Sequence, residues 1–173
     1  MNLQLTNTKH FNYWLTGTGW AEATFANENQ SVTFEVSYLS DPLWDMFEAL
    51  YRLLTEGTKF EKIVFAGEPG EHVLTLAIQS GGTLNIEILW NDDWEELAIQ
   101  EKIVADNGLV ATNKEVIYKD TDTVENFCLL VCQGIDDLLR RTSIEEYKKQ
   151  WRLYDFPLSS FNQLKQQLPL TIE

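Results

Sequence analysis

The sequence predicts an α+β fold in which an antiparallel sheet of about five to six strands, ordered ββα and then a β-meander, packs against two long helices. Apolar residues recur at helical spacing over residues 41–54 and 123–141, and shorter stretches alternate apolar with polar residues as strands do. Hydrophobic residues make up 44% of the 173 residues, which is enough for one domain over residues 1–173 with a buried core. We expect the polar residues 1–12 to fray.

Two strands open the predicted sheet. Thr16–Phe25 alternates small residues with larger or polar ones, and Ser31–Tyr38 alternates apolar with polar residues. The polar turn Ala26–Gln30 between them is short, so we expect the two strands to pair antiparallel and to leave one face toward water.

The best specified helix follows these strands. Asp41 can cap its first turn, and Pro42 suits the first helical position, where a missing N–H does no harm. Gly57 is expected to end the helix in a left-handed conformation. The apolar face that should pack on the sheet comprises Leu43, Trp44, Phe47, Leu50, Tyr51 and Leu54.

The rest of the chain is predicted to add a meander and further helices. The meander is expected at Lys59–Ala66, Glu71–Gln79 and Thr83–Trp90. A sixth strand is expected at Leu97–Val104 and a short seventh at Glu115–Tyr118. Helices are expected at Thr123–Arg141, Ser143–Leu153 and Phe161–Leu168. Cys128 and Cys132 lie in an apolar helical pattern without the second ligand pair of a zinc site, so we expect them to be buried.

Charge and composition favour a basic protein partner. The net charge is −14, and residues 87–137 carry 13 acidic and 3 basic side chains. Nucleic-acid binding is disfavoured because phosphates require a basic footprint, whereas a positively charged partner would be attracted. No apolar run approaches the ~20 residues that span a bilayer. The start of the chain lacks the features of a signal peptide, so we expect a cytoplasmic protein that does not bind membranes.

The most suggestive cluster combines acids with tryptophan and comprises Trp90, Asp92, Asp93, Trp94, Glu95 and Glu96. Carboxylates can bind a divalent cation, but this run lacks the spacing of an EF-hand loop. A plain solvated loop is one interpretation. A partner-binding loop is the other, because tryptophan is enriched at binding hot spots. We expect no metal and no cofactor.

A second group, Glu68, Glu71 and His72, flanks a Pro-Gly turn. A carboxylate beside a histidine can serve acid–base catalysis, but neighbours on a strand point to opposite faces, so we expect a surface turn. The chain also lacks a glycine-rich phosphate loop and a nucleophile elbow. We therefore expect no catalytic residues and no enzymatic activity.

In size, charge, α+β class and absence of catalytic residues, with its acidic stretch from Glu87 to Asp137, the chain resembles the immunity proteins of bacterial toxin systems. The resemblance is one of class and transfers no functional residue. It implies that the protein blocks a cognate toxin, often a nuclease with a basic active site.

Two other functions remain open from the sequence. One is a small-molecule-binding or catalytic domain with a pocket between sheet and helices, lined by Trp20, Phe34, Tyr38 and Trp44. The other is a structural subunit of a larger assembly.

Overall fold

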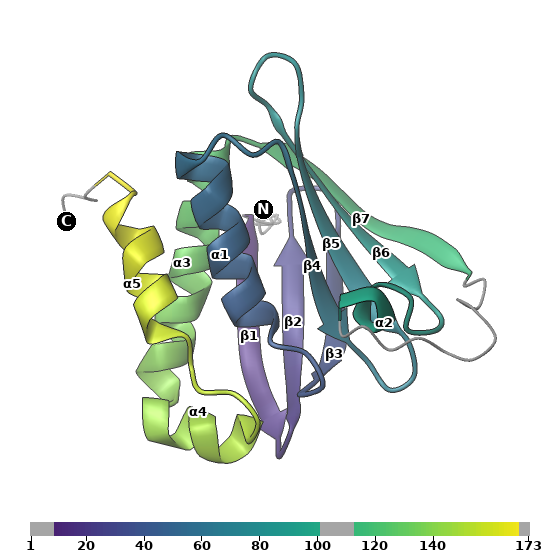
Figure 1. The fold of residues 1–173 in the computed structure, drawn as a ribbon, viewed down its shortest axis with the longest axis vertical. Helices are drawn as coiled ribbons and strands as arrows, with labels where there is room; N and C mark the ends of the chain where they lie inside the picture. Colours follow the sequence, from purple (N-terminus) through teal and green to yellow (C-terminus); the bar gives the residue numbers. More distant parts are fainter. Residues whose placement is uncertain (1–8, 101–112, 170–173) are drawn as a thin grey trace, which may run out of the picture.

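The computed structural model describes residues 9–100 and 113–169, which form seven strands and five helices in an α+β arrangement (Figure 1). One antiparallel sheet contains, in order, β1 (His10–Gly17), β2 (Trp20–Ala26) and β3 (Ser31–Ser37). The second antiparallel sheet contains, in order, β4 (Phe60–Ala66), β5 (Glu71–Ile78), β6 (Leu84–Asn91) and β7 (Lys114–Asp122). The α+β class and the antiparallel pairing are confirmed, but the prediction of a single sheet of five to six strands is wrong.

The two sheets meet through aromatic side chains on their inner faces. The ring of Phe65 in β4 lies 5.5 Å from that of Phe34 in β3 and 6.2 Å from that of Phe25 in β2, measured between centroids. Because one sheet packs on the other, these rings are buried from both sides. If β3 and β4 were joined edge to edge in a single sheet, one side of each ring would stay uncovered. Alternation in the sequence identifies inner faces but does not tell which sheet each strand joins.

The first predicted strand, Thr16–Phe25, is confirmed for Trp20–Phe25, which lie in β2, but its start is wrong because a tight turn interrupts it. Thr18 and Gly19 connect β1 to β2, and Gly19 has a φ of +76°, which a residue with a side chain rarely adopts. β1 begins at His10 and pairs with β2 along its length, so the last residues of the stretch expected to fray lie in a strand.

α1 (Pro42–Thr55) begins and ends as predicted. The Asp41 carboxylate accepts a hydrogen bond of 3.4 Å from the Trp44 amide, and Gly57 follows the helix with a φ of +72°. The prediction that Trp44 belongs to the buried face is wrong, because its side chain is 48% exposed. The stripe that enters the core comprises Leu43, Met46, Phe47, Ala49, Leu50 and Leu53.

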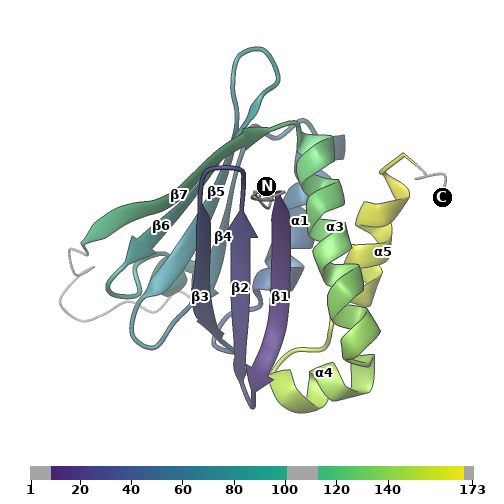
Figure 2. The ribbon, with the colours of Figure 1, turned by 180° about the vertical axis from the view of Figure 1, so that it is seen from behind.

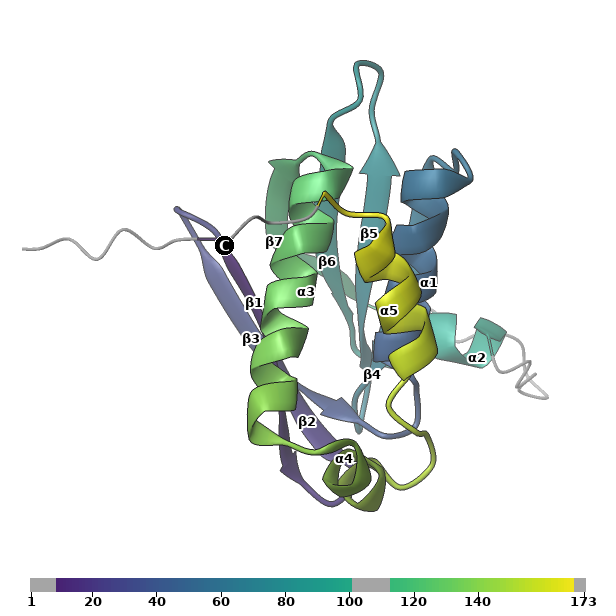
Figure 3. The ribbon, with the colours of Figure 1, turned by 90° about the vertical axis from the view of Figure 1, so that its left-hand side faces the viewer.

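Three helices complete the C-terminal half: α3 (Val124–Arg141), α4 (Ile144–Trp151) and α5 (Leu158–Gln166). Figure 3 shows α1, α3 and α5 side by side, and Figure 2 shows α3 running along β1. Gly134 permits this contact, since a Cβ there would lie 2.1 Å from the carbonyl oxygen of Phe11. Cys128 and Cys132 are buried and free, as predicted.

The segment after β6 differs from its prediction. The strand expected at Leu97–Val104 is wrong for its first four residues, which belong to the short helix α2 (Glu96–Gln100), and residues 101–104 lie outside the described residues. Glu71 accounts for the helix, because its carboxylate binds the amides that open the first turn. The short strand predicted at Glu115–Tyr118 is part of the longer β7. None of the described helices is long and apolar enough to cross a membrane.

Candidate functional site

Most of the residues singled out in the sequence belong to segments that lie near one another in the lower half of Figure 1. The Ala66 amide at the end of β4 donates to the Ser40 hydroxyl, 3.0 Å away, just before α1. Further bonds described below join the β4–β5 turn, the loop after β6, α2 and α1. We call this region the acidic end; its exposed and half-buried side chains include Asp41, Trp44, Asp45, Glu68, Asp92, Asp93 and Trp94.

Glu71 is the anchor of the acidic end. Its side chain is completely buried, yet its carboxylate accepts hydrogen bonds from the backbone amides of Glu95, Glu96 and Leu97 at 3.1, 2.7 and 2.8 Å. The Asn91 side-chain amide donates a fourth, at 2.8 Å. The expectation that Glu71 lies in a surface turn is therefore wrong. A buried carboxylate needs such donors, and here they are the free amides at the start of α2.

Trp94 is fixed in orientation although it is 37% exposed. Its indole N–H donates to the carbonyl oxygens of Gly67 and Gly70, at 2.9 and 2.8 Å. Both carbonyls belong to the β4–β5 turn, so the loop after β6 is tied to that turn. The exposed ring is thus presented in one position rather than left to rotate.

The acids of the predicted loop divide into paired and outward-facing groups. Glu95 forms an ion pair of 2.8 Å with Lys114, and Glu96 forms one of 2.7 Å with Lys62. Asp92 accepts two hydrogen bonds from Asn113, which lower the pKa of its carboxyl. Asp93 is exposed, and its carboxylate accepts the backbone amide of Trp94.

Trp90 is half-buried and packs on Gly70 rather than joining the exposed loop. Its ring faces inward and lies 4.6 Å from His72 on the neighbouring strand. Together they line a cavity of about 170 Å³ that also contacts Trp20, Glu35, Gly67, Glu68 and Pro69. The structure therefore brings the acidic loop residues together but directs Trp90 to the interior side of the turn.

The His72 side chain lines this smaller cavity. Its ring stacks on Phe34 at 3.9 Å, and burial lowers its pKa to about 4, so it is neutral at pH 7. Its Nδ1 atom has no hydrogen-bond partner among the described residues. The two neighbours have different contacts, because Glu71 binds the loop amides while His72 stacks on Phe34.

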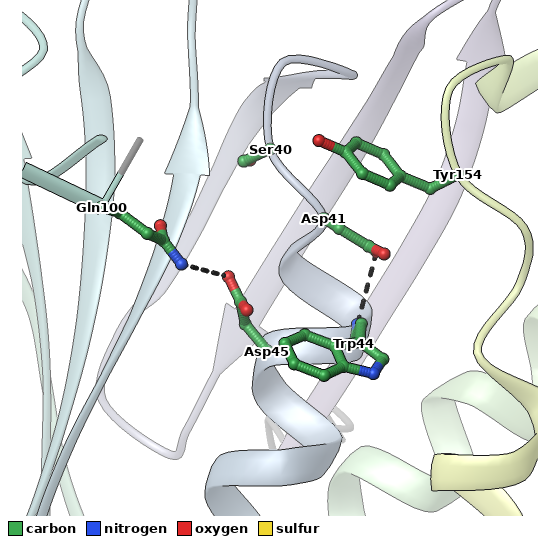
Figure 4. Close-up of a pocket in the computed structure, with 6 residues that line it drawn as sticks. All are labelled: Ser40, Asp41, Trp44, Asp45, Gln100 and Tyr154. Carbon is green, nitrogen blue, oxygen red and sulfur yellow. Dashed lines mark hydrogen bonds between the residues drawn. The ribbon is translucent and has the colours of Figure 1, made fainter. Parts of the chain in front are cut away.

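A larger cavity opens beside the start of α1, and we call it the α1 pocket. It measures about 370 Å³ and is lined by Ser40, Asp41, Trp44, Asp45, Gln100 and Tyr154 (Figure 4). In the view of Figure 4 the Asp41 carboxylate lies between the rings of Trp44 and Tyr154. The Gln100 side-chain amide donates to Asp45 at 3.1 Å, which links α2 to α1 across the pocket.

Ionisation of the Asp41 carboxyl is unfavourable in the folded protein. Burial and the nearby Asp45 carboxylate raise the pKa of Asp41 to about 6, against the opposing effect of the Trp44 amide. Behind it lie Tyr13 and Tyr147, whose hydroxyl groups are buried and have no hydrogen-bond partner among the described residues. Burial raises the pKa of both phenols, and the charge of Asp41 contributes.

The pocket predicted from Trp20, Phe34, Tyr38 and Trp44 does not exist as one cavity. Trp20 lines the smaller cavity and Trp44 the α1 pocket, while Phe34 is buried between the sheets. Sequence reasoning treated Asp41 only as a helix cap and missed the pocket. The sequence does contain a signal for the exposure of Trp44. Met46 and Leu53 complete an apolar stripe on α1 at helical spacing, and Trp44 lies outside that stripe.

Comparison with protein-family models, curated proteins and solved structures gives no match to this chain. Among residues 9–100 and 113–169, no group of three or more histidine, cysteine, aspartate or glutamate side chains is arranged to hold a metal ion. The site is therefore interpreted from its own geometry: a fixed loop that carries acids and tryptophan beside an acidic, aromatic pocket.

Proposed function

We propose that this chain is a non-enzymatic binding protein that recognises a basic protein partner through the acidic end. The observation that carries the proposal is the anchoring of an exposed acidic loop by the buried Glu71 carboxylate. A loop held in place before binding loses less conformational entropy when a partner docks, so its contacts contribute more to affinity.

The chemistry of the acidic end fits such a partner. Glu68, Asp92 and Asp93 are exposed, and the nearby lysines are already paired with Glu95 and Glu96. Negative charge at this end would steer a basic surface toward it and fix its orientation. Trp44 and Trp94 add large, partly exposed aromatic surfaces of the kind that dominate interface energetics.

Within this class, we propose an immunity protein that neutralises a cognate toxin, such as a nuclease with a basic active site. Such a toxin presents arginine and lysine where it binds phosphate, and the acidic end offers carboxylates to the same groups. A protein of this kind needs no catalytic residue of its own, only a stable surface of opposite charge.

The test is capture of the partner from the native host with the tagged protein and with two charge variants. E68Q/D93N removes two charges at the acidic end, and each new amide keeps an oxygen for the hydrogen bond now accepted from Ser37 or the Trp94 amide. E28Q/E125Q removes two exposed charges from the β2–β3 turn and the start of α3, at the opposite end of the molecule (Figure 1).

We expect the wild type and the E28Q/E125Q control to retain one basic protein at moderate salt, and E68Q/D93N to lose most of it. A partner retained equally by all three proteins would contradict a role for the acidic end. Retention of an acidic protein, or of nucleic acid alone, would contradict the proposed class of partner.

A further inference from the structure

We propose that the α1 pocket is a socket for an arginine side chain of the basic partner. This inference rests on the proposed function, because it names the group of the partner that enters the acidic end. It is carried by the pocket itself, a cavity that combines two carboxylates with two aromatic rings.

The aromatic rings suit a guanidinium group. Trp44 is 48% exposed, and its ring and that of Tyr154 line the same cavity. A guanidinium is flat and weakly hydrated, so it stacks on aromatic faces more readily than the compact, strongly hydrated ammonium of lysine. Trp44 lies outside the buried stripe of α1, so its exposed ring is available for such a contact.

The two carboxylates provide the matching charge. Asp41 and Asp45 both line the pocket, and each is held by a neighbour: Asp41 by the Trp44 amide and Asp45 by Gln100. Two like charges in a partly buried pocket oppose each other, and a bound cation would relieve that repulsion. Carboxylates also accept the paired N–H groups of arginine with matching geometry.

The size of the pocket favours a long side chain over a bare ion. Its volume of about 370 Å³ far exceeds the roughly 10–15 Å³ of cavity that one water molecule needs. The cavity therefore has room for a guanidinium head and part of its aliphatic stem. Gln100 lies at the α2 side of the pocket, where its amide can also contact a ligand that enters between the two helices.

The experiment titrates the full chain with three short blocked peptides at low salt: one containing two arginines, one with two lysines and one with two citrullines, the neutral isostere of arginine. Indole N–H signals in NMR spectra report where each peptide binds. The W44F and W94F variants assign the signals of the two exposed tryptophans.

The pocket variant is D41N/D45N, in which asparagine preserves the helix cap at position 41. E28Q/E125Q is its matched control, because it also removes two charges, one of them in the first turn of a helix, and both acids are exposed and lie outside the pocket. Far-UV circular dichroism and thermal melts establish that both variants fold.

We expect the arginine peptide to shift the Trp44 signal saturably and to bind about tenfold more tightly than the lysine peptide. D41N/D45N should abolish this preference, and E28Q/E125Q should preserve it. A Trp94 shift with an unchanged Trp44 signal would overturn the socket but leave the acidic end as a binding surface. No response at either tryptophan would contradict both the socket and the proposed function.

Discussion

The carboxylate of Glu71 accepts a hydrogen bond of 2.7 Å from the backbone amide of Glu96, so a completely buried acid fixes the start of an acidic segment. The bond joins β5 to α2 and, with the bonds to Glu95 and Leu97, replaces water for three otherwise free amides. Stability and recognition at the acidic end therefore depend on the same side chain.

The first prediction concerns this anchor. In E71Q the side chain is neutral and one oxygen becomes an NH₂ group that faces amide donors, so part of the network is lost. We expect the free energy of unfolding to fall by about 3 kcal/mol, because buried amides that now donate to the carboxylate would lose their acceptor. Urea unfolding measures it, with E115Q at an exposed position as the control. Equal stability of the two variants would contradict the anchor.

The network around Glu71 also shows the limit of sequence reasoning. A glutamate after a Pro-Gly turn looks like a surface residue, and its burial depends on amides 24 to 26 positions later in the chain. The cap and end of α1 were predictable because Asp41 and Gly57 act on their immediate neighbours. The α1 pocket was not, because Tyr154 and Gln100 reach it only through the tertiary fold.

The second prediction follows from the raised pKa of Asp41. Because its folded-state pKa of about 6 lies above the ordinary value of 3.8, the fold favours the protonated form. The stability from this group is present below pH 4 and is lost as the pH rises to 6. Urea unfolding should find D41N more stable than the wild type at pH 7.5 by about 1 kcal/mol, after allowance for solvent screening.

At pH 4 the two proteins should unfold at nearly the same urea concentration, because Asp41 is then largely protonated in the folded wild type. D45N serves as the comparison, since it removes the neighbouring charge but leaves Asp41 in place. An advantage of D41N that is the same at both pH values would contradict the raised pKa.

The third prediction concerns His72, whose pKa shifts in the opposite direction. Burial lowers it from 6.5 to about 4, so the unfolded chain takes up a proton first as the pH falls. The stability that depends on neutral His72 is complete above pH 6.5 and is lost toward pH 4. In H72F the aromatic stack on Phe34 is retained without the proton.

Relative to the wild type, H72F should therefore gain about 2 kcal/mol in free energy of unfolding between pH 7 and pH 4. Denaturant titrations at four or five pH values across this range measure the difference. Plots of unfolding free energy against pH that run parallel for the two proteins would contradict the desolvation of His72, whose ring lies between those of Phe34 and Trp90.

The fourth prediction tests how α3 packs on the first sheet. In G134A the new methyl group would lie 2.1 Å from the carbonyl oxygen of Phe11, so β1 and α3 must separate. We expect a loss of about 3 kcal/mol or more in the free energy of unfolding from this overpacking. Thermal unfolding measures the loss, and G17A, where a Cβ meets nothing within 4 Å, is the control. A G134A protein as stable as G17A would show that this contact is looser than the structure indicates.

The most direct test of the central claim is the association rate of the captured basic partner, measured by stopped-flow fluorescence from low to high salt. If the acidic end steers the encounter, the rate for the wild type should fall about tenfold or more between 0.05 and 0.5 M salt. E68Q/D93N should associate more slowly at low salt and converge on the wild type at high salt. A rate that does not change with salt, or is the same for both proteins at low salt, would contradict recognition through the acidic end.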